Sequence, residues 1–207
     1  MKNVFLLLFV LVHQILIGQT IDSVQVKLKY GADDPDLKLY MMANKIDLYK
    51  IKIANSTSRP VKFTIVSKEI WDGNITKVDT LMSAKYFNKL SLNTGDSLNL
   101  SVLTSHITSD SIRFNFDFNR AGSTYVKFSK SKSESYSLRD GVLSNGRQIK
   151  LSSNGVYPLL VYSLPYEDPK YPGYLFYCKL TGENISPLDW YEKYGIKHYI
   201  IFDLITE

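Results

Sequence analysis

Residues 112–119 read IRFNFDFN, and their apolar and polar side chains alternate without a break. Every second side chain is large and apolar, namely Ile112, Phe114, Phe116 and Phe118. A strand sends successive side chains to opposite faces of a sheet, so this period of two predicts a strand with one buried face and one solvated face. Strands of this kind are typical of antiparallel sheets.

The same alternation occurs in three other segments, which we therefore predict to be strands. They are VQVKLKY at 24–30, LYKIKIA at 48–54 and SLNLSVL at 97–103. Short turn sequences rich in Asn, Asp and Gly separate the apolar runs, and these residues tolerate the backbone angles of tight hairpins. Many short strands between such turns predict a mainly β protein with an antiparallel β-sandwich fold.

The segments LYKIKIANSTSRPVKFTIV and LSLNTGDSLNLSV, which lie within residues 46–103, carry a family resemblance. Their order resembles bacterial immunoglobulin-like domains, in which a Gly-Asp/Glu-Ser turn often precedes an alternating strand. The resemblance implies an immunoglobulin-like sandwich. It implies no function, since one fold serves many functions.

One segment departs from the strand pattern. In NISPLDWYEKYG (184–195), Ser186 is a suitable N-cap, Pro187 suits the first helical position, and Gly195 suits the helix end. We therefore predict one short C-terminal helix at 187–194. The closing strand predicted at 196–205 is apolar on both faces, so it should be central or covered.

The chain begins with the features of a secretory signal. Lys2 precedes an apolar run at 4–12, and the small residue Gly18 suits a signal peptidase. We predict a signal peptide at 1–18, cut after Gly18 or Gln19, and an exported protein of the periplasm or the cell surface. The alternative is a retained anchor, for which the apolar run is short. The Gly-Gln ending also resembles secretory signals of Bacteroidota.

Residues 19–207 are predicted to form a single β-rich domain without a transmembrane segment. A Ser-rich, charged stretch at 129–137 marks a possible sub-boundary. A division there would leave a C-terminal piece too small for independent stability without a disulfide or a metal.

The composition argues against several function classes. The chain has 25 Lys+Arg and 20 Asp+Glu among 207 residues, and the small excess is spread along the strands, so no nucleic-acid partner is expected. Cys178, His106 and His198 lie far apart, without zinc spacing, a nucleophile elbow or a phosphate loop. No catalytic residue and no cofactor is therefore indicated.

The loop PYEDPKYPG (165–173) is the candidate binding site. It lies between predicted strands at 158–164 and 174–180 and is too rich in proline to pair in a ladder. Its candidate residues are Tyr166, Glu167, Asp168, Lys170 and Tyr171. Rigid aromatic side chains between prolines suit recognition of a glycan or a protein. The alternative is a loop that folds over the sheet edge with its tyrosines packed down.

The acidic turn ADDPD offers a calcium candidate made of Asp33, Asp34 and Asp36. Calcium prefers several converging carboxylate oxygens, but the spacing matches no defined calcium loop. The alternative is an exposed hairpin tip, because Asp and Pro are turn formers.

Four Asp-Ser/Thr-aliphatic triplets resemble the O-glycosylation acceptors of exported Bacteroidota proteins. Their hydroxyl residues are Ser23, Thr80, Ser97 and Ser111. The resemblance implies solvating glycans at these positions. Alternatively, each residue only belongs to the turn that leads into a strand.

The sequence thus predicts a non-enzymatic, exported binding module of the cell envelope. Its loops would contact an envelope protein or a polysaccharide. One alternative is a periplasmic inhibitor or immunity protein. Another is a hydrolase, which would require several acids or a His–acid pair to converge in one cleft.

Overall fold

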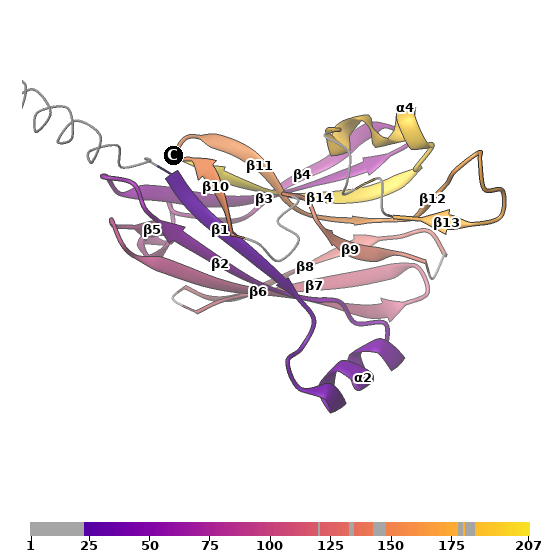
Figure 1. Cartoon of the computed structure of the whole chain (residues 1–207), viewed down its shortest axis with the longest axis horizontal. Coiled ribbons are helices and arrows are strands. Elements are labelled where there is room, and N and C mark those ends of the chain that lie inside the picture. The colour runs from indigo at the N-terminus through magenta and orange to yellow at the C-terminus, as the bar shows by residue number, and fades with distance from the viewer. Residues whose placement is uncertain (1–22, 120, 133–134, 143–147, 178–179, 181–184) are drawn as a thin grey trace, which may run out of the picture.

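The computed structural model describes residues 23–119, 121–132, 135–142, 148–177, 180 and 185–207. These residues form an antiparallel β-sandwich with a short C-terminal helix, which confirms the predicted fold class (Figure 1). The predicted signal peptide at 1–18 and Cys178 lie outside the described residues. None of the helices described is both long and apolar enough to cross a membrane. An immunoglobulin-like relationship stays a prediction.

The first sheet has six strands, of which five come from the first two thirds of the chain. In spatial order they are β10 (Gln148–Ser152), β1 (Ser23–Tyr30), β2 (Leu48–Asn55), β6 (Ser97–Thr108), β7 (Ser111–Phe118) and β8 (Gly122–Ser129). All of the predicted strands at 24–30, 48–54, 97–103 and 112–119 lie in this sheet.

The second sheet places the C-terminal strand near its centre. Its strands are β4 (Asn74–Ser83), β3 (Val61–Trp71), β14 (His198–Thr206), β11 (Gly155–Ser163) and β9 (Ser137–Asp140), with β5 (Ser91–Leu92) paired to β3. β14 therefore lies between β3 and β11, as its apolar character on both faces predicts. The stretch 129–137 links β8 of the first sheet to β9 of the second, and both sheets combine strands from either side of it.

The core lies between the two sheets. The apolar side chains predicted to face inward from β7 are all buried. Phe114 of β7 meets Phe202 of β14 with ring centroids 4.8 Å apart, so the first sheet packs directly on the second. Burial of such alternate aromatic side chains is the main stabilising contribution to the sandwich.

The C-terminal helix has the predicted boundaries. A 3₁₀ turn, η2 (Pro187–Asp189), runs into α4 (Trp190–Tyr194). The Ser186 hydroxyl accepts a hydrogen bond from the Leu188 amide at 3.2 Å, and Gly195 ends the helix in the left-handed region with φ of 66°. Trp190 is buried against Tyr199, which fixes the helix on the second sheet.

A second helix, α2 (Pro35–Ala43), occupies the place where the sequence predicts only a turn. The Asp34 carboxylate accepts a hydrogen bond from the Leu37 amide at 2.8 Å and so acts as the N-cap, while Pro35 takes the first helical position. An Asp-Pro pair suits both a turn and a helix start, which explains the difference. α2 stands apart from the two sheets, between β1 and β2 (Figure 1).

The predicted strand at 174–180 is also much shorter in the structure. Only β13 (Leu175–Phe176) is a strand there, and it pairs with β12 (Tyr166–Glu167) inside the loop that was expected not to pair. Pro165 and Pro169 flank β12 without interrupting its two residues, so the local ladder survives. One further 3₁₀ turn, η1 (Asn88–Leu90), precedes β5.

Candidate functional site

The five residues of the predicted binding loop do not share one surface. Tyr166 is buried, with its ring 4.8 Å from that of Tyr194. Asp168 is also buried, and its carboxylate accepts a hydrogen bond from the Lys170 amide at 3.0 Å. Glu167 accepts one from the Gly173 amide at 2.6 Å. Tyr166, Glu167 and Asp168 therefore shape the hairpin itself.

The remaining candidates of this loop reach solvent. Tyr171 is 58% exposed, and Tyr174 just beyond the predicted loop is 69% exposed. Lys170 is exposed as well. The hairpin thus presents two tyrosines and a lysine while its base is packed down.

Lysines neutralise Asp33 of the acidic turn. Asp33 forms ion pairs with Lys29 and Lys50, and the distance to the Lys50 ammonium is 2.8 Å. Hydrogen bonds from these two lysines lower the pKa of Asp33 to about 2. Asp34 instead caps α2. In the described part of the chain, no three His, Cys, Asp or Glu side chains group as a metal site would require.

The four predicted glycosylation residues differ in their access to solvent. Thr80 is exposed on β4, which lies at a sheet edge. Ser97 and Ser111 are half-buried at the starts of β6 and β7, and Ser23 is buried at the start of β1. Thr80 therefore offers the most accessible hydroxyl of the four.

A groove that the sequence analysis did not predict lies beneath α2. We call it the α2 groove, and its volume is about 560 Å³. Its lining residues are Tyr30, Gly31, Ala32, Lys38, Met41, Met42, Lys45, Ile46, Asp47 and Tyr136. The walls combine two methionines, an isoleucine and two tyrosines with lysines at two positions, so the groove is apolar in part and cationic in part. Unbranched methionine side chains adapt readily to the shape of a bound group.

Asp47 fixes one wall of the α2 groove. Its carboxylate accepts hydrogen bonds from the Tyr30 hydroxyl at 2.8 Å and from the Leu138 amide at 2.9 Å. It thereby joins the end of β1 to β9 of the other sheet. Burial raises the pKa of Asp47, and burial together with the Asp47 charge raises the pKa of Tyr30 to about 12. Tyr30 consequently stays protonated at neutral pH and keeps donating this hydrogen bond.

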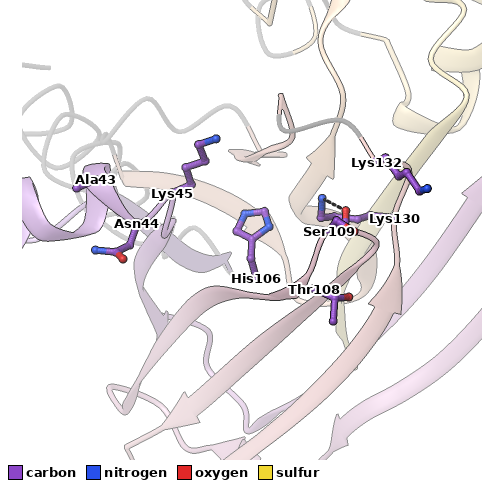
Figure 2. Close-up of a pocket in the computed structure, with 8 residues that line it drawn as sticks. All are labelled: Ala43, Asn44, Lys45, His106, Thr108, Ser109, Lys130 and Lys132. Atoms are coloured by element: carbon purple, nitrogen blue, oxygen red, sulfur yellow. Dashed lines mark hydrogen bonds between the residues drawn. The ribbon is translucent and has the colours of Figure 1, made fainter.

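A cationic pocket of about 240 Å³ adjoins the α2 groove, since Lys45 lines both (Figure 2). Its lining residues are Ala43, Asn44, Lys45, His106, Thr108, Ser109, Lys130 and Lys132. Lys130 is only 5% exposed, and its ammonium donates a hydrogen bond to the Ser109 carbonyl at 2.8 Å. Partial burial, followed by the charge of Lys130, lowers the pKa of His106. The pocket therefore combines three ammonium groups with a neutral imidazole at pH 7.

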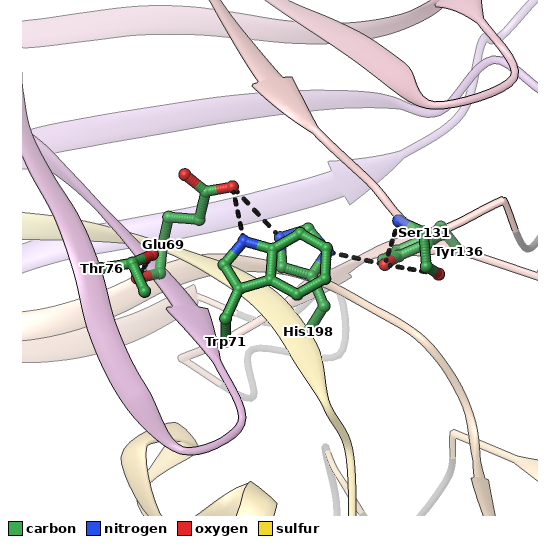
Figure 3. Close-up of polar contacts among 6 residues, drawn as sticks. All are labelled: Glu69, Trp71, Thr76, Ser131, Tyr136 and His198. Atoms are coloured by element: carbon green, nitrogen blue, oxygen red, sulfur yellow. Dashed lines mark hydrogen bonds and ion pairs between the residues drawn. The ribbon is translucent and has the colours of Figure 1, made fainter.

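A buried polar row lies behind Tyr136, and Figure 3 shows its members. The His198 Nδ1 atom lies 2.6 Å from the Tyr136 hydroxyl, and its Nε2 atom lies 3.4 Å from a carboxylate oxygen of Glu69. The Trp71 indole donates to the same Glu69 oxygen at 3.1 Å and stacks on the imidazole at 3.8 Å between ring centroids. Ser131 completes the row, because its amide donates to the Tyr136 hydroxyl at 3.2 Å. We call these five residues the His198 row.

The His198 row supports the structure of the groove wall, and its imidazole is closed off from solvent. His198 has no exposed surface and Tyr136 is buried, so a substrate cannot reach the imidazole. Burial raises the pKa of Tyr136, which keeps the phenol protonated at neutral pH. The Tyr136 ring meanwhile lies 5.7 Å from the Lys130 ammonium. The row thus holds the aromatic ring that lines the α2 groove and lies beside the Lys130 ammonium.

Neither a protein-family model, nor a curated protein, nor a solved structure matches this chain.

Proposed function

We propose that this protein is a non-enzymatic binding module that holds a segment of a partner protein at the α2 groove. The segment would place a bulky apolar side chain in the groove and an anionic group in the adjoining cationic pocket. The observation that carries the proposal is the adjacency of the two cavities, which share Lys45 as a lining residue at the end of a projecting helix. The predicted export of the chain would place this partner in the cell envelope.

The apolar character of α2 supports a protein partner. Four large side chains of this nine-residue helix are well exposed: Leu37, Leu39, Tyr40 and Met42. Exposed apolar side chains are common singly, but a group of them beside a groove is typical of interaction sites. Met42 lines the groove and is also 68% exposed. A partner bound there would therefore cover both the groove and the exposed apolar side chains of α2.

The charge of the site supports an anionic group on the partner. Lys38 lines the α2 groove, and the lysines of the cationic pocket extend the same sign of charge beside it. Complementary charge speeds association and favours one orientation of the partner over others. An envelope inhibitor or immunity protein, which would block a toxin or a protease, is a particular form of this proposal. Hydrolysis is not favoured, because His198 of the His–acid pair with Glu69 has no surface exposed to solvent.

We expect the substitution Met42→Glu to abolish capture of the partner. A carboxylate at the groove would be desolvated by the bound apolar side chain, which costs far more than the lost contact. The measurement is quantitative affinity capture from an envelope extract with the tagged protein. A binding titration of each captured protein against the tagged protein follows. The matched control is Val78→Glu, which adds the same charge at an exposed apolar position on β4.

The supporting result is a protein retained by the wild type and by Val78→Glu and lost with Met42→Glu. A set of captured proteins that does not change with Met42→Glu would overturn the proposal. Circular dichroism should show the same fold for both variants, because both positions are exposed.

Two exposed tyrosines favour a second candidate, the binding of a polysaccharide at the β12–β13 hairpin. Tyr171 and Tyr174 present rigid rings of the kind that pack on sugar faces. On a glycan array we expect the double substitution of these tyrosines by alanine to weaken binding about tenfold, as the loss of two aromatic contacts predicts. Tyr125→Ala, at an equally exposed position on β8, is the control. An array without any bound glycan would remove this candidate.

A further inference from the structure

We infer that the cationic pocket is a binding site for a tetrahedral oxyanion, a sulfate or phosphate group. If the sulfate or phosphate group belongs to a partner segment, this inference deepens the proposed function and rests on it. If the group is a free ion, the inference stands by itself. The inference is carried by the observation that three lysines and a histidine line one small cavity beside the α2 groove.

The cationic groups come from three separate parts of the chain. Lys45 follows the end of α2 in the left-handed backbone region, with φ of 52°. His106 projects from β6, and Lys130 and Lys132 follow directly after β8. In Figure 2 the His106 ring lies between Lys45 and Lys130. These like charges repel one another, and a bound anion would reduce that repulsion.

Lys130 gives the pocket a rigid centre. Its side chain is almost wholly buried, its ammonium donates to the Ser109 carbonyl, and the Tyr136 ring lies beneath it. Tyr136 is held in turn by the His198 row. A cation fixed in this way loses little entropy when an anion binds, which distinguishes it from mobile surface lysines.

Two nearby carboxylates offset part of the positive charge, since Asp110 interacts electrostatically with Lys132 and Lys130, and Asp47 with His106. Asp110 accepts a hydrogen bond from the Thr108 hydroxyl at 2.5 Å, and Asp47 accepts those of Tyr30 and Leu138. Neither residue lines the cationic pocket. The described lining residues include no acid, so the charge of the pocket itself is cationic.

The side chains suit a tetrahedral oxyanion better than a carboxylate. Planar carboxylates are recognised best by the fork of an arginine, and no described lining residue is an arginine. Lysines act as point charges that can approach oxygens from several directions, and Ser109 adds a hydroxyl to the same wall. Three ammonium charges exceed the two negative charges of a dianion.

His106 should couple anion binding to pH. Burial and the charges of Lys130 and Lys45 lower its pKa in the free protein, while Asp47 acts in the opposite direction. A bound dianion would stabilise the imidazolium and raise this pKa. The affinity for sulfate should therefore rise as the pH falls from 7.5 to 5.5, by roughly fivefold.

The test is isothermal titration of the full mature protein with sodium sulfate at constant ionic strength, with chloride as the exchanged ion. We expect saturable one-site binding that Lys132→Gln weakens about fivefold, as the loss of one close charge predicts. Lys132 is exposed, so this variant should fold normally. Lys127→Gln, an exposed lysine on β8 outside the pocket, is the matched control and should stay within twofold.

Two further arms separate the sources of the anion. Inorganic phosphate tests the free ion, and a short peptide with and without a phosphotyrosine tests the esterified group. Tighter binding of the phosphopeptide than of inorganic phosphate places the oxyanion on a partner segment. Equal affinities for the two assign the pocket to the free ion. Either result supports the inference. Absence of saturable sulfate binding, or equal losses in Lys132→Gln and Lys127→Gln, overturns it.

Met42→Glu keeps this inference distinguishable from the proposed function. The substitution should remove the partner protein and leave the sulfate affinity within about twofold, because Met42 does not line the cationic pocket. A protein that binds its partner through α2 but binds no oxyanion would contradict only the present inference.

Discussion

Replacement of Phe202 by alanine is expected to lower the free energy of unfolding by about 3–5 kcal/mol, among the largest losses for a single substitution in this protein. Phe202 has no exposed surface and lies on β14, the inner strand of the second sheet. Its ring centroid lies 4.8 Å from that of Phe114 and 5.3 Å from that of Phe116, both on β7 of the opposite sheet. Truncation therefore opens a cavity where the two sheets meet.

The measurement is urea unfolding monitored by intrinsic fluorescence and by far-ultraviolet circular dichroism. Tyr86→Ala is the control, because Tyr86 is 71% exposed and its removal should cost less than about 1 kcal/mol. If Phe202→Ala lost no more stability than Tyr86→Ala, the two sheets would not pack on each other through Phe202 as described.

The strands of the sandwich were predictable because their signal is local. In residues 112–119 each inward side chain is large and apolar and each outward one is polar, so only one face could be buried. β14 was predictable for the opposite reason, since apolar side chains on both faces fit only an inner strand.

Helix α2 was not predictable by the same reasoning. Its apolar residues Leu37, Leu39 and Met42 are exposed, and they lie on several sides of the helix instead of one stripe. Without a period of 3.6, the Asp-Pro start was the only helix signal, and it is shared with turns.

The cavities were missed because their residues are distant in the sequence. Tyr30, Asp47, His106 and Tyr136 come together only through the packing of β1, β6 and the segment before β9. The composition of the 165–173 loop was visible, but composition does not show which tyrosine faces inward. The pairing of β12 with β13 decides that, by turning Tyr166 toward Tyr194.

His198 shows the limit of sequence motifs most directly. From the sequence it is a lone histidine in an apolar strand. In the structure its partners come from β3 and from the 131–136 segment, because the register pairs His198 with Trp71 and the sheet edge brings Tyr136 to its other side. No spacing rule links residues 69, 136 and 198.

We expect His198→Ala to lower the free energy of unfolding by about 3–5 kcal/mol, comparable to truncation of a buried aromatic ring. The substitution removes a ring without exposed surface that stacks on Trp71, and it deprives Tyr136 and Glu69 of a polar partner. His198→Phe keeps the ring volume and the stacking, so it should lose only about 1–3 kcal/mol for the unpaired polar groups. Chemical unfolding at pH 7 measures both variants.

The difference between these two variants separates packing from hydrogen bonding in the His198 row. Tyr136→Phe, which removes only the hydroxyl, is the companion for a double-mutant cycle with His198→Phe, and the coupling between them should be about 0.5–3 kcal/mol. Because the Tyr136 ring lies beneath Lys130, His198→Phe should also weaken sulfate binding, although it changes no charge at the pocket. If the two substitutions were additive and sulfate affinity stayed constant, the row would be a packing feature of the core with no role in positioning the cationic pocket.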